Sequence, residues 1–124
     1  MYTRTHFQIQ VEIEQSNEGP IPHVHVYHDK TRNPKKCSYV RLDKAEYSSH
    51  HDVLKLPKNL KQQFIECMHQ TWEGRALTLK DRAMRYATGY EAAVAIWVES
   101  YEDDYSKFNL DENGVPIMPD YSQL

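Results

Sequence analysis

The chain has 124 residues, of which 40% are hydrophobic and 27% are charged, a size and composition typical of one globular domain. No apolar run approaches the roughly 18 to 20 residues that a membrane-spanning helix needs, and residues 1–6 do not lead into a signal-peptide core. We therefore expect a cytoplasmic protein with no membrane partner. The two cysteines, Cys37 and Cys67, predict no disulfide framework.

The charge is unevenly distributed along the chain. Residues 1–98 hold 14 lysines and arginines against 11 acids, whereas residues 99–124 hold one lysine against 7 acids. The large positive excess that attracts nucleic acid is missing, so we expect no direct nucleic-acid binding. A local basic patch consists of Lys30, Arg32, Lys35 and Lys36.

Three stretches, residues 6–14, 22–29 and 37–43, alternate apolar and polar residues with the period of a half-buried strand. They predict a three-stranded antiparallel meander. The residues expected to face the core are Phe7, Ile9, Val11, Ile13, Val24, Val26, Val40 and Leu42. The residues expected on an exposed polar face are Gln8, Gln10, Glu12, His23, His25, Tyr27, Tyr39, Arg41 and Asp43.

The second half predicts helices. Pro57 suits the first turn of an amphipathic helix that ends near Gly74, and residues 78–86 could form a short one. Thr88 and Glu91 form a capping box before a strongly apolar helix. The expected fold is α+β, in which two or three helices pack on one face of the meander and an irregular acidic tail follows. One domain then comprises a meander (1–52), a helical part (57–104) and a tail (109–124).

The motif His23-Val24-His25 is the sharpest chemical feature of the sequence. On a strand it places two imidazoles on one face, about 6 to 7 Å apart at their Cα atoms, close enough to share a tetrahedral cation. Zinc is the default ion for imidazole ligands with an optional carboxylate. The chain after the third strand is expected to pass this end of the sheet, so we predict a structural zinc site formed by His23, His25, His50, His51 and Asp52. Further possible ligands, among which no spacing selects, are His6, His28, Asp29, Cys37 and His69. Alternatively, the histidines are an ordinary outward strand face.

An enzyme is the less favoured interpretation. A metal-dependent hydrolase or nuclease of toxin type could use the same histidines and the basic patch for phosphate, but no glutamate is placed as a general base beside them. Cys37 and Cys67 lack the surroundings that activate a thiol. The four glycines are isolated, which excludes a phosphate-cradling loop. No catalytic residue is therefore assigned.

The acidic C-terminal region suggests a binding surface. Its carboxylates alternate with aromatic residues, which are enriched at protein interfaces, and a basic partner would fit it. The residues expected to contact a partner are Glu102, Asp103, Asp104, Tyr105, Phe108 and Tyr121. Alternatively, these acids only keep the protein soluble.

The sequence Pro22-His23-Val24-His25-Val26, which follows a polar turn and precedes a strand and a helix ending at Trp72-Glu73, resembles a family of small bacterial proteins, domain of unknown function 4160. The resemblance covers residues 7–74, with Ile21 where the family has the first of two prolines. It implies a compact α+β domain with the histidine pair at positions 23 and 25, and it implies no activity.

Small size, no catalytic constellation and an acidic aromatic C-terminus also look like phage or mobile-element inhibitors such as anti-CRISPR proteins, by analogy alone. The leading hypothesis is therefore a zinc-binding protein that inhibits or regulates a nucleic-acid-handling protein, for example a CRISPR nuclease, by direct contact. Zinc would then stabilise a small domain with a limited core. The sequence does not indicate the oligomeric state.

Overall fold

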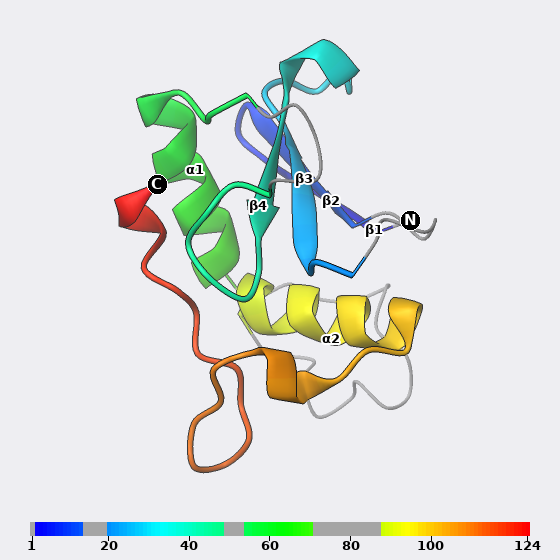
Figure 1. The fold of residues 1–124 in the computed structure, drawn as a ribbon. Helices are drawn as coiled ribbons and strands as arrows, with labels where there is room; N and C mark the ends of the chain where they lie inside the picture. The colour runs from blue at the N-terminus through cyan, green and yellow to red at the C-terminus, as the bar shows by residue number, and fades with distance from the viewer. Residues whose placement is uncertain (1, 14–19, 49–53, 71–87) are drawn as a thin grey trace.

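The computed structural model of the protein describes residues 2–13, 20–48, 54–70 and 88–124. It confirms the α+β class, with a four-stranded antiparallel sheet in the order β1-β2-β3-β4 and two helices (Figure 1). The strands are β1 (Tyr2–His6), β2 (Ile9–Ile13), β3 (His23–Tyr27) and β4 (Cys37–Arg41). The helices are α1 (Lys58–His69) and α2 (Gly89–Tyr101), with short 3-10 helices η1 (Pro34–Lys36), η3 (Tyr105–Lys107) and η4 (Tyr121–Gln123).

The sheet has one strand more than the sequence predicted, because residues 2–6, of which only His6 was expected to lie in a strand, form β1, and β2 takes residues 9–13 of the expected strand 6–14. His6 pairs with Ile9, so Phe7 and Gln8 form the turn between β1 and β2. Phe7 has a φ of 49° and its side chain is 70% exposed, so the expectation that it faces the core is wrong. Phenylalanine rarely adopts positive φ, so this residue type does not indicate a turn at position 7.

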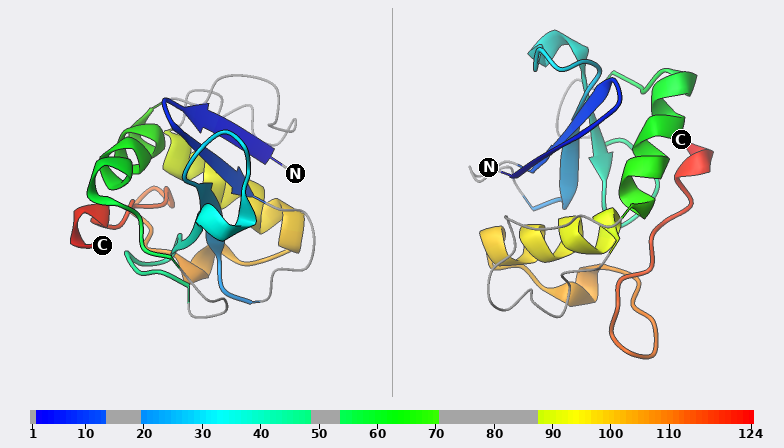
Figure 2. Two further views of the ribbon diagram at one scale, coloured as in Figure 1. Left: turned by 90° about the horizontal axis from the view of Figure 1, so that it is seen from above. Right: turned by 180° about the vertical axis from the view of Figure 1, so that it is seen from behind.

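One face of the sheet is apolar and packs against α1. Val11 pairs with Val26, and Val24 pairs with Val40. These valines are fully or almost fully buried and form one core with Leu60, Phe64 and Met68 of α1. The predicted inward residues of β2, β3 and β4 are thus confirmed as core. Figure 2 shows α1 beside the sheet, while α2 crosses at the end where β3 begins.

Both predicted helix starts are confirmed. α1 begins directly after Pro57. At the start of α2, the Glu91 N–H donates to the Thr88 hydroxyl (3.3 Å), and the Thr88 N–H donates to the Glu91 carboxylate (2.8 Å). This capping box satisfies two N–H groups of the first turn. α2 is buried through the continuous stretch 92–97, so it is an internal helix. α1 ends at His69, because Gln70 is already extended, so the expected end of the first helix at Gly74 is wrong. The expected short helix at 78–86 lies outside the described residues.

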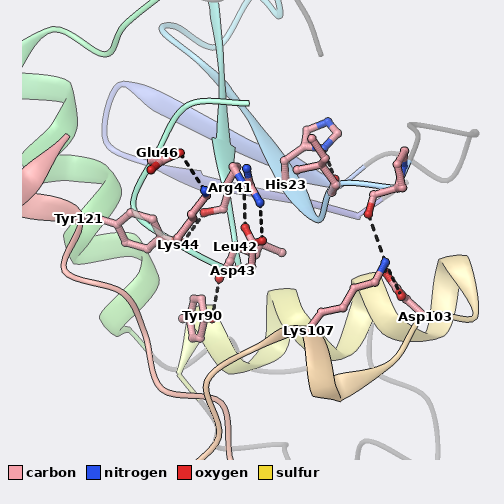
Figure 3. Close-up of polar contacts among 12 residues, drawn as sticks. His23, Arg41, Leu42, Asp43, Lys44, Glu46, Tyr90, Asp103, Lys107 and Tyr121 are labelled. Carbon is pink, nitrogen blue, oxygen red and sulfur yellow. Dashed lines mark hydrogen bonds and ion pairs between the residues drawn. The ribbon is translucent and has the colours of Figure 1, made fainter. Parts of the chain in front are cut away.

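The C-terminal segment packs against the rest of the domain and supplies core residues. Tyr121 is 1% exposed and its ring lies 5.0 Å from that of Phe64 in α1. Its hydroxyl donates to the Arg41 carbonyl (2.7 Å), while the Tyr90 hydroxyl donates to the next carbonyl, that of Leu42 (2.6 Å). Figure 3 shows both rings pointing at the end of β4. The two tyrosines therefore join α2 and the C-terminal segment to the sheet.

Replacement of Tyr121 tests this anchor. Tyr121→Phe removes the hydroxyl and leaves the Arg41 carbonyl without this donor, so we expect the free energy of unfolding to fall by about 1 kcal/mol. Tyr121→Ala also creates a cavity and should cost about 3 to 5 kcal/mol. Urea titration followed by far-ultraviolet circular dichroism measures both values. Equal stability of wild type and Tyr121→Ala would contradict the anchoring role.

Candidate functional site: the buried polar face and the acidic C-terminal surface

The second face of the sheet carries polar side chains, which we call the polar face: Glu12, His23, His25, Tyr27 and Tyr39. Glu12 pairs with His25, and His25 pairs with Tyr39, so these three side chains form one row across the sheet. The sequence predicted this face to be exposed, and that prediction is wrong for its centre: Glu12 is 0%, His23 1% and His25 7% exposed. Of the other residues expected on this face, Tyr27 is buried and Gln8 is exposed, while the half-buried ones are Gln10, Tyr39, Arg41 and Asp43. Alternation predicts that a strand has two faces, but it does not show whether the second face is covered.

Two described residues that cover the polar face come from other parts of the chain. Trp97 of α2 places its ring 5.5 Å from that of His23. Arg32, in the loop between β3 and β4, reaches Glu12 with a nitrogen-to-oxygen distance of 2.7 Å. Its guanidinium also lies 5.6 Å from the centre of the Tyr27 ring, within cation–π range.

The Glu12–Arg32 ion pair compensates two unfavourable features. A fully buried carboxylate is costly unless it is paired. Arg32 itself has a φ of 55°, a left-handed conformation that costs a non-glycine residue of the order of 1 kcal/mol or more. The hydrogen bond and the charge of Glu12 raise the pKa of Arg32, so the guanidinium stays protonated. The loop between β3 and β4 is thereby fixed to the sheet.

Tyr27 makes the polar face sensitive to alkaline pH. Burial, reinforced by the negative charge of Glu12, raises the pKa of Tyr27 from 10.0 to about 12. The unfolded chain therefore loses this phenolic proton about two pH units before the folded protein does, and the free energy of unfolding must fall between pH 10 and 12.

We expect Tyr27→Phe to make this alkaline loss of stability shallower. Denaturant titrations at several pH values between about 9 and 12 measure the slope. Burial also raises the pKa values of Tyr90 and Tyr121, so the variant should retain part of the loss. Identical slopes for wild type and Tyr27→Phe would show that Tyr27 ionises normally in the folded protein.

His23 and His25 form a stacked pair on the polar face. Their ring centres are 5.2 Å apart and the planes differ by 18°. His23 Nδ1 lies 2.8 Å from the Ile21 carbonyl oxygen; because a carbonyl only accepts, Nδ1 carries the proton, and Nε2 is the basic nitrogen of the neutral ring. Metal-binding histidines commonly make this kind of hydrogen bond. The His25 ring also contacts the Tyr39 ring at 4.4 Å.

Two of the five predicted zinc ligands, His23 and His25, lie in the described part of the chain. His50, His51 and Asp52 lie outside the described residues, so their position relative to His23 and His25 stays a prediction. Within the ranges that the structure describes, no group of three or more histidines, cysteines or acids could hold a metal ion. His6 and His28 lie elsewhere, the first next to Glu66 of α1 (3.3 Å) and the second next to Ser38 (2.8 Å).

Elemental analysis tests the zinc prediction directly. If zinc is bound, tag-free wild-type protein should contain one equivalent and the double variant His23→Ala, His25→Ala should contain none. Chelation should then lower the melting temperature of the wild type but not that of the double variant. His28→Ala is the matched control, because this histidine lies on the opposite face of the sheet. Absence of stoichiometric metal from wild type would make the stacked pair a packing feature.

The predicted partner-binding residues differ in their exposure to solvent. Glu102 and Asp104 are exposed. Tyr105 is half-buried against the core, and Phe108 and Tyr121 are core residues, 6% and 1% exposed, so the last two cannot form a contact surface and that part of the prediction is wrong. The sequence pattern overlooked Leu110 and Ile117, which are 37% and 51% exposed and follow no regular period.

Asp103 has a structural role. Its carboxylate accepts a hydrogen bond from the Trp97 indole N–H (2.9 Å) and pairs with Lys107 (2.9 Å). Burial acts to raise its pKa, but the hydrogen bonds from Lys107 and Trp97 outweigh burial and hold that pKa below the usual value. Figure 3 shows Lys107 bridging from Asp103 toward the chain before β3, where it donates to the Pro20 carbonyl (3.2 Å).

The two cysteine thiols and the Ser38 hydroxyl are buried. His28 Nε2 lies 2.8 Å from the Ser38 hydroxyl, but Ser38 is fully buried and a substrate could not reach it. Cys37 and Cys67 are also buried. The Cys37, Ser38 and Cys67 side chains are therefore part of the protein interior.

Comparisons with family models, curated proteins and solved structures give no match to this chain. The resemblance to domain of unknown function 4160 therefore stays a prediction that depends on the histidine motif. Within the described residues, no helix is long and apolar enough to cross a bilayer.

Proposed function

We propose that the protein is a small binding protein that inhibits or regulates a nucleic-acid-handling protein by direct contact. The observation that carries this proposal is the acid-rich segment 102–120, which we call the acidic end and which is anchored to the core. Two exposed apolar residues, Leu110 and Ile117, belong to the same segment. The exposed carboxylates of the acidic end are those of Glu102, Asp104, Asp111, Glu112 and Asp120.

The acidic end is held in place on both sides of its exposed loop. Before the loop, Phe108 is buried and Lys107 donates to the Pro20 carbonyl. After the loop, Tyr121 is buried, and Lys61 of α1 donates to two main-chain carbonyls of the C-terminal segment (3.2 Å each). A surface fixed in advance loses less conformational entropy on binding than a flexible one. This anchoring favours a contact surface over a tail that only improves solubility.

The chemistry of the acidic end favours a basic partner. Proteins that hold nucleic acid present grooves lined with lysine and arginine, and carboxylates at such a groove would occupy positions that phosphates otherwise take. A CRISPR nuclease is one protein of this kind, and a bound inhibitor would block its nucleic-acid channel. Zinc held by His23 and His25 would be structural in this scheme, since it would lie in the sheet rather than at the contact.

Cleavage assays with purified CRISPR nucleases of different types test the proposal. We expect added wild-type protein to inhibit at least one of them near stoichiometric concentration. The variant Glu102→Lys, Asp104→Lys, Glu112→Lys should raise the concentration needed for inhibition by about tenfold or more, because it opposes the partner's charge. Asp103 is left intact in this variant because its replacement would disturb Trp97 and Lys107.

The matched control is Glu46→Lys, which reverses an exposed acid on the turn after β4 and should leave inhibition unchanged. Circular dichroism verifies that each variant is folded. Failure to inhibit any nuclease in the panel, or equal inhibition by wild type and the triple variant, would contradict the proposal. Metal-stimulated cleavage by the protein alone, abolished in His23→Ala, would instead support a metal-dependent nuclease.

A further inference from the structure

The loop between β3 and β4 carries exposed lysines at the end of the molecule opposite to the acidic end. Lys30, Lys35 and Lys36 are all exposed. Figures 1 and 2 show this loop, in cyan, at one extreme of the molecule and the orange loop of residues 109–117 at the other. The uneven charge of the sequence is therefore also a separation in space.

The basic loop has a fixed shape. Arg32 holds it to Glu12 (2.7 Å). The Asn33 side chain caps η1 by accepting from the Lys35 N–H (3.0 Å), and the His28 N–H donates to the Lys36 carbonyl (2.9 Å). The lysines consequently project from an ordered support, and their charges act together on a partner.

An exposed aromatic residue lies at the same end of the sheet. Gln10 of β2 pairs with Tyr27, the last residue of β3, so the Phe7–Gln8 turn before β2 and the basic loop after β3 leave the sheet at one end. Phe7 is 70% exposed and has positive φ. The positive φ belongs to the two-residue turn between β1 and β2. The Phe7 ring lies edge-on to that of His6 (4.6 Å) and leaves most of its surface exposed. We call Phe7, Lys30, Lys35 and Lys36 together the basic end.

We propose that the protein associates head to tail with copies of itself, so that the basic end of one copy contacts the acidic end of the next. The two surfaces have opposite charge, each is held by core contacts, and each exposes apolar side chains: Phe7 on one, Leu110 and Ile117 on the other. Complementary potentials of this kind orient an encounter and exclude like-with-like pairing. The net charge of −3 disfavours nucleic acid as the occupant of the basic end.

The geometry sets the form of the assembly. Because the two surfaces lie at opposite ends, the contact is heterologous and each added copy leaves one basic and one acidic end unoccupied. Association should therefore continue beyond a dimer. If the proposed function is correct, self-association also covers the acidic end, so a basic partner must compete with it. This last consequence rests on the proposed function, whereas self-association itself does not.

Sedimentation velocity on the purified protein tests the inference. At about 0.05 M salt we expect the weight-average sedimentation coefficient to rise with protein concentration, and at about 0.5 M salt we expect a monomer, since salt screens exposed charges. The variant Lys30→Gln, Lys35→Gln, Lys36→Gln removes the three lysine charges of the basic end, and the variant Glu102→Gln, Asp104→Gln, Glu112→Gln removes three of the exposed carboxylates of the acidic end. Each variant alone should remain monomeric at low salt.

A mixture of the two variants gives the sharper result. Each retains the surface that the other lacks, so the mixture should form a 1:1 heterodimer that cannot extend. Lys44→Gln and Glu46→Gln, on the turn after β4, are the charge controls and should associate like wild type. A monomeric wild type at low salt, or a mixture that stays monomeric, would overturn the inference. Binding of a labelled oligonucleotide by the wild type that is lost in the lysine variant, without self-association, would assign the basic end to nucleic acid instead.

Discussion

The ion pair between Glu12 and Arg32 is the constraint on which much of the structure depends. Glu12 lies in the middle of the sheet with no exposed surface, and burial of a charge at that position is tolerable because a cation reaches it. Arg32 reaches it only when its loop folds back over the sheet. The same contact thus allows both faces of the sheet to be buried and shapes the loop that displays the lysines. The Glu12–Arg32 pair therefore determines both how the polar face of the sheet is covered and where the surface lysines of the loop lie.

The parts of the fold that depend on local sequence could be predicted from it. The buried valines of β3 and the capping box of α2 follow from spacing within a few residues. The covering of the polar face could not be predicted, because Trp97 meets His23 across 74 positions of the chain. The turn at Phe7 was hidden for another reason: its residue type does not indicate the backbone conformation that it adopts.

In the candidate sites, too, local sequence predicts which residues lie together, while long-range contacts decide which of them are exposed. The motif His23-Val24-His25 identified two side chains that do lie together, with ring centres 5.2 Å apart, but their burial and stacking were not visible in the sequence. Charge counting located the acidic region, yet it could not separate Glu102, which faces solvent, from Asp103, which is engaged by Trp97 and Lys107. Composition identifies where charges gather along the chain, and tertiary contacts decide which of them a partner can reach.

The position of Tyr121 in the core also has a consequence for how the chain folds during synthesis. This residue packs against Phe64 of α1 and donates to the end of β4, 80 positions earlier. The residues of the sheet and of both helices are synthesised before Tyr121, which completes their core. Contacts so distant in sequence slow folding, and a nascent chain whose core is incomplete exposes apolar surface until its last contacts form. Pausing of translation shortly before residue 121 would therefore prolong a state that depends on chaperones.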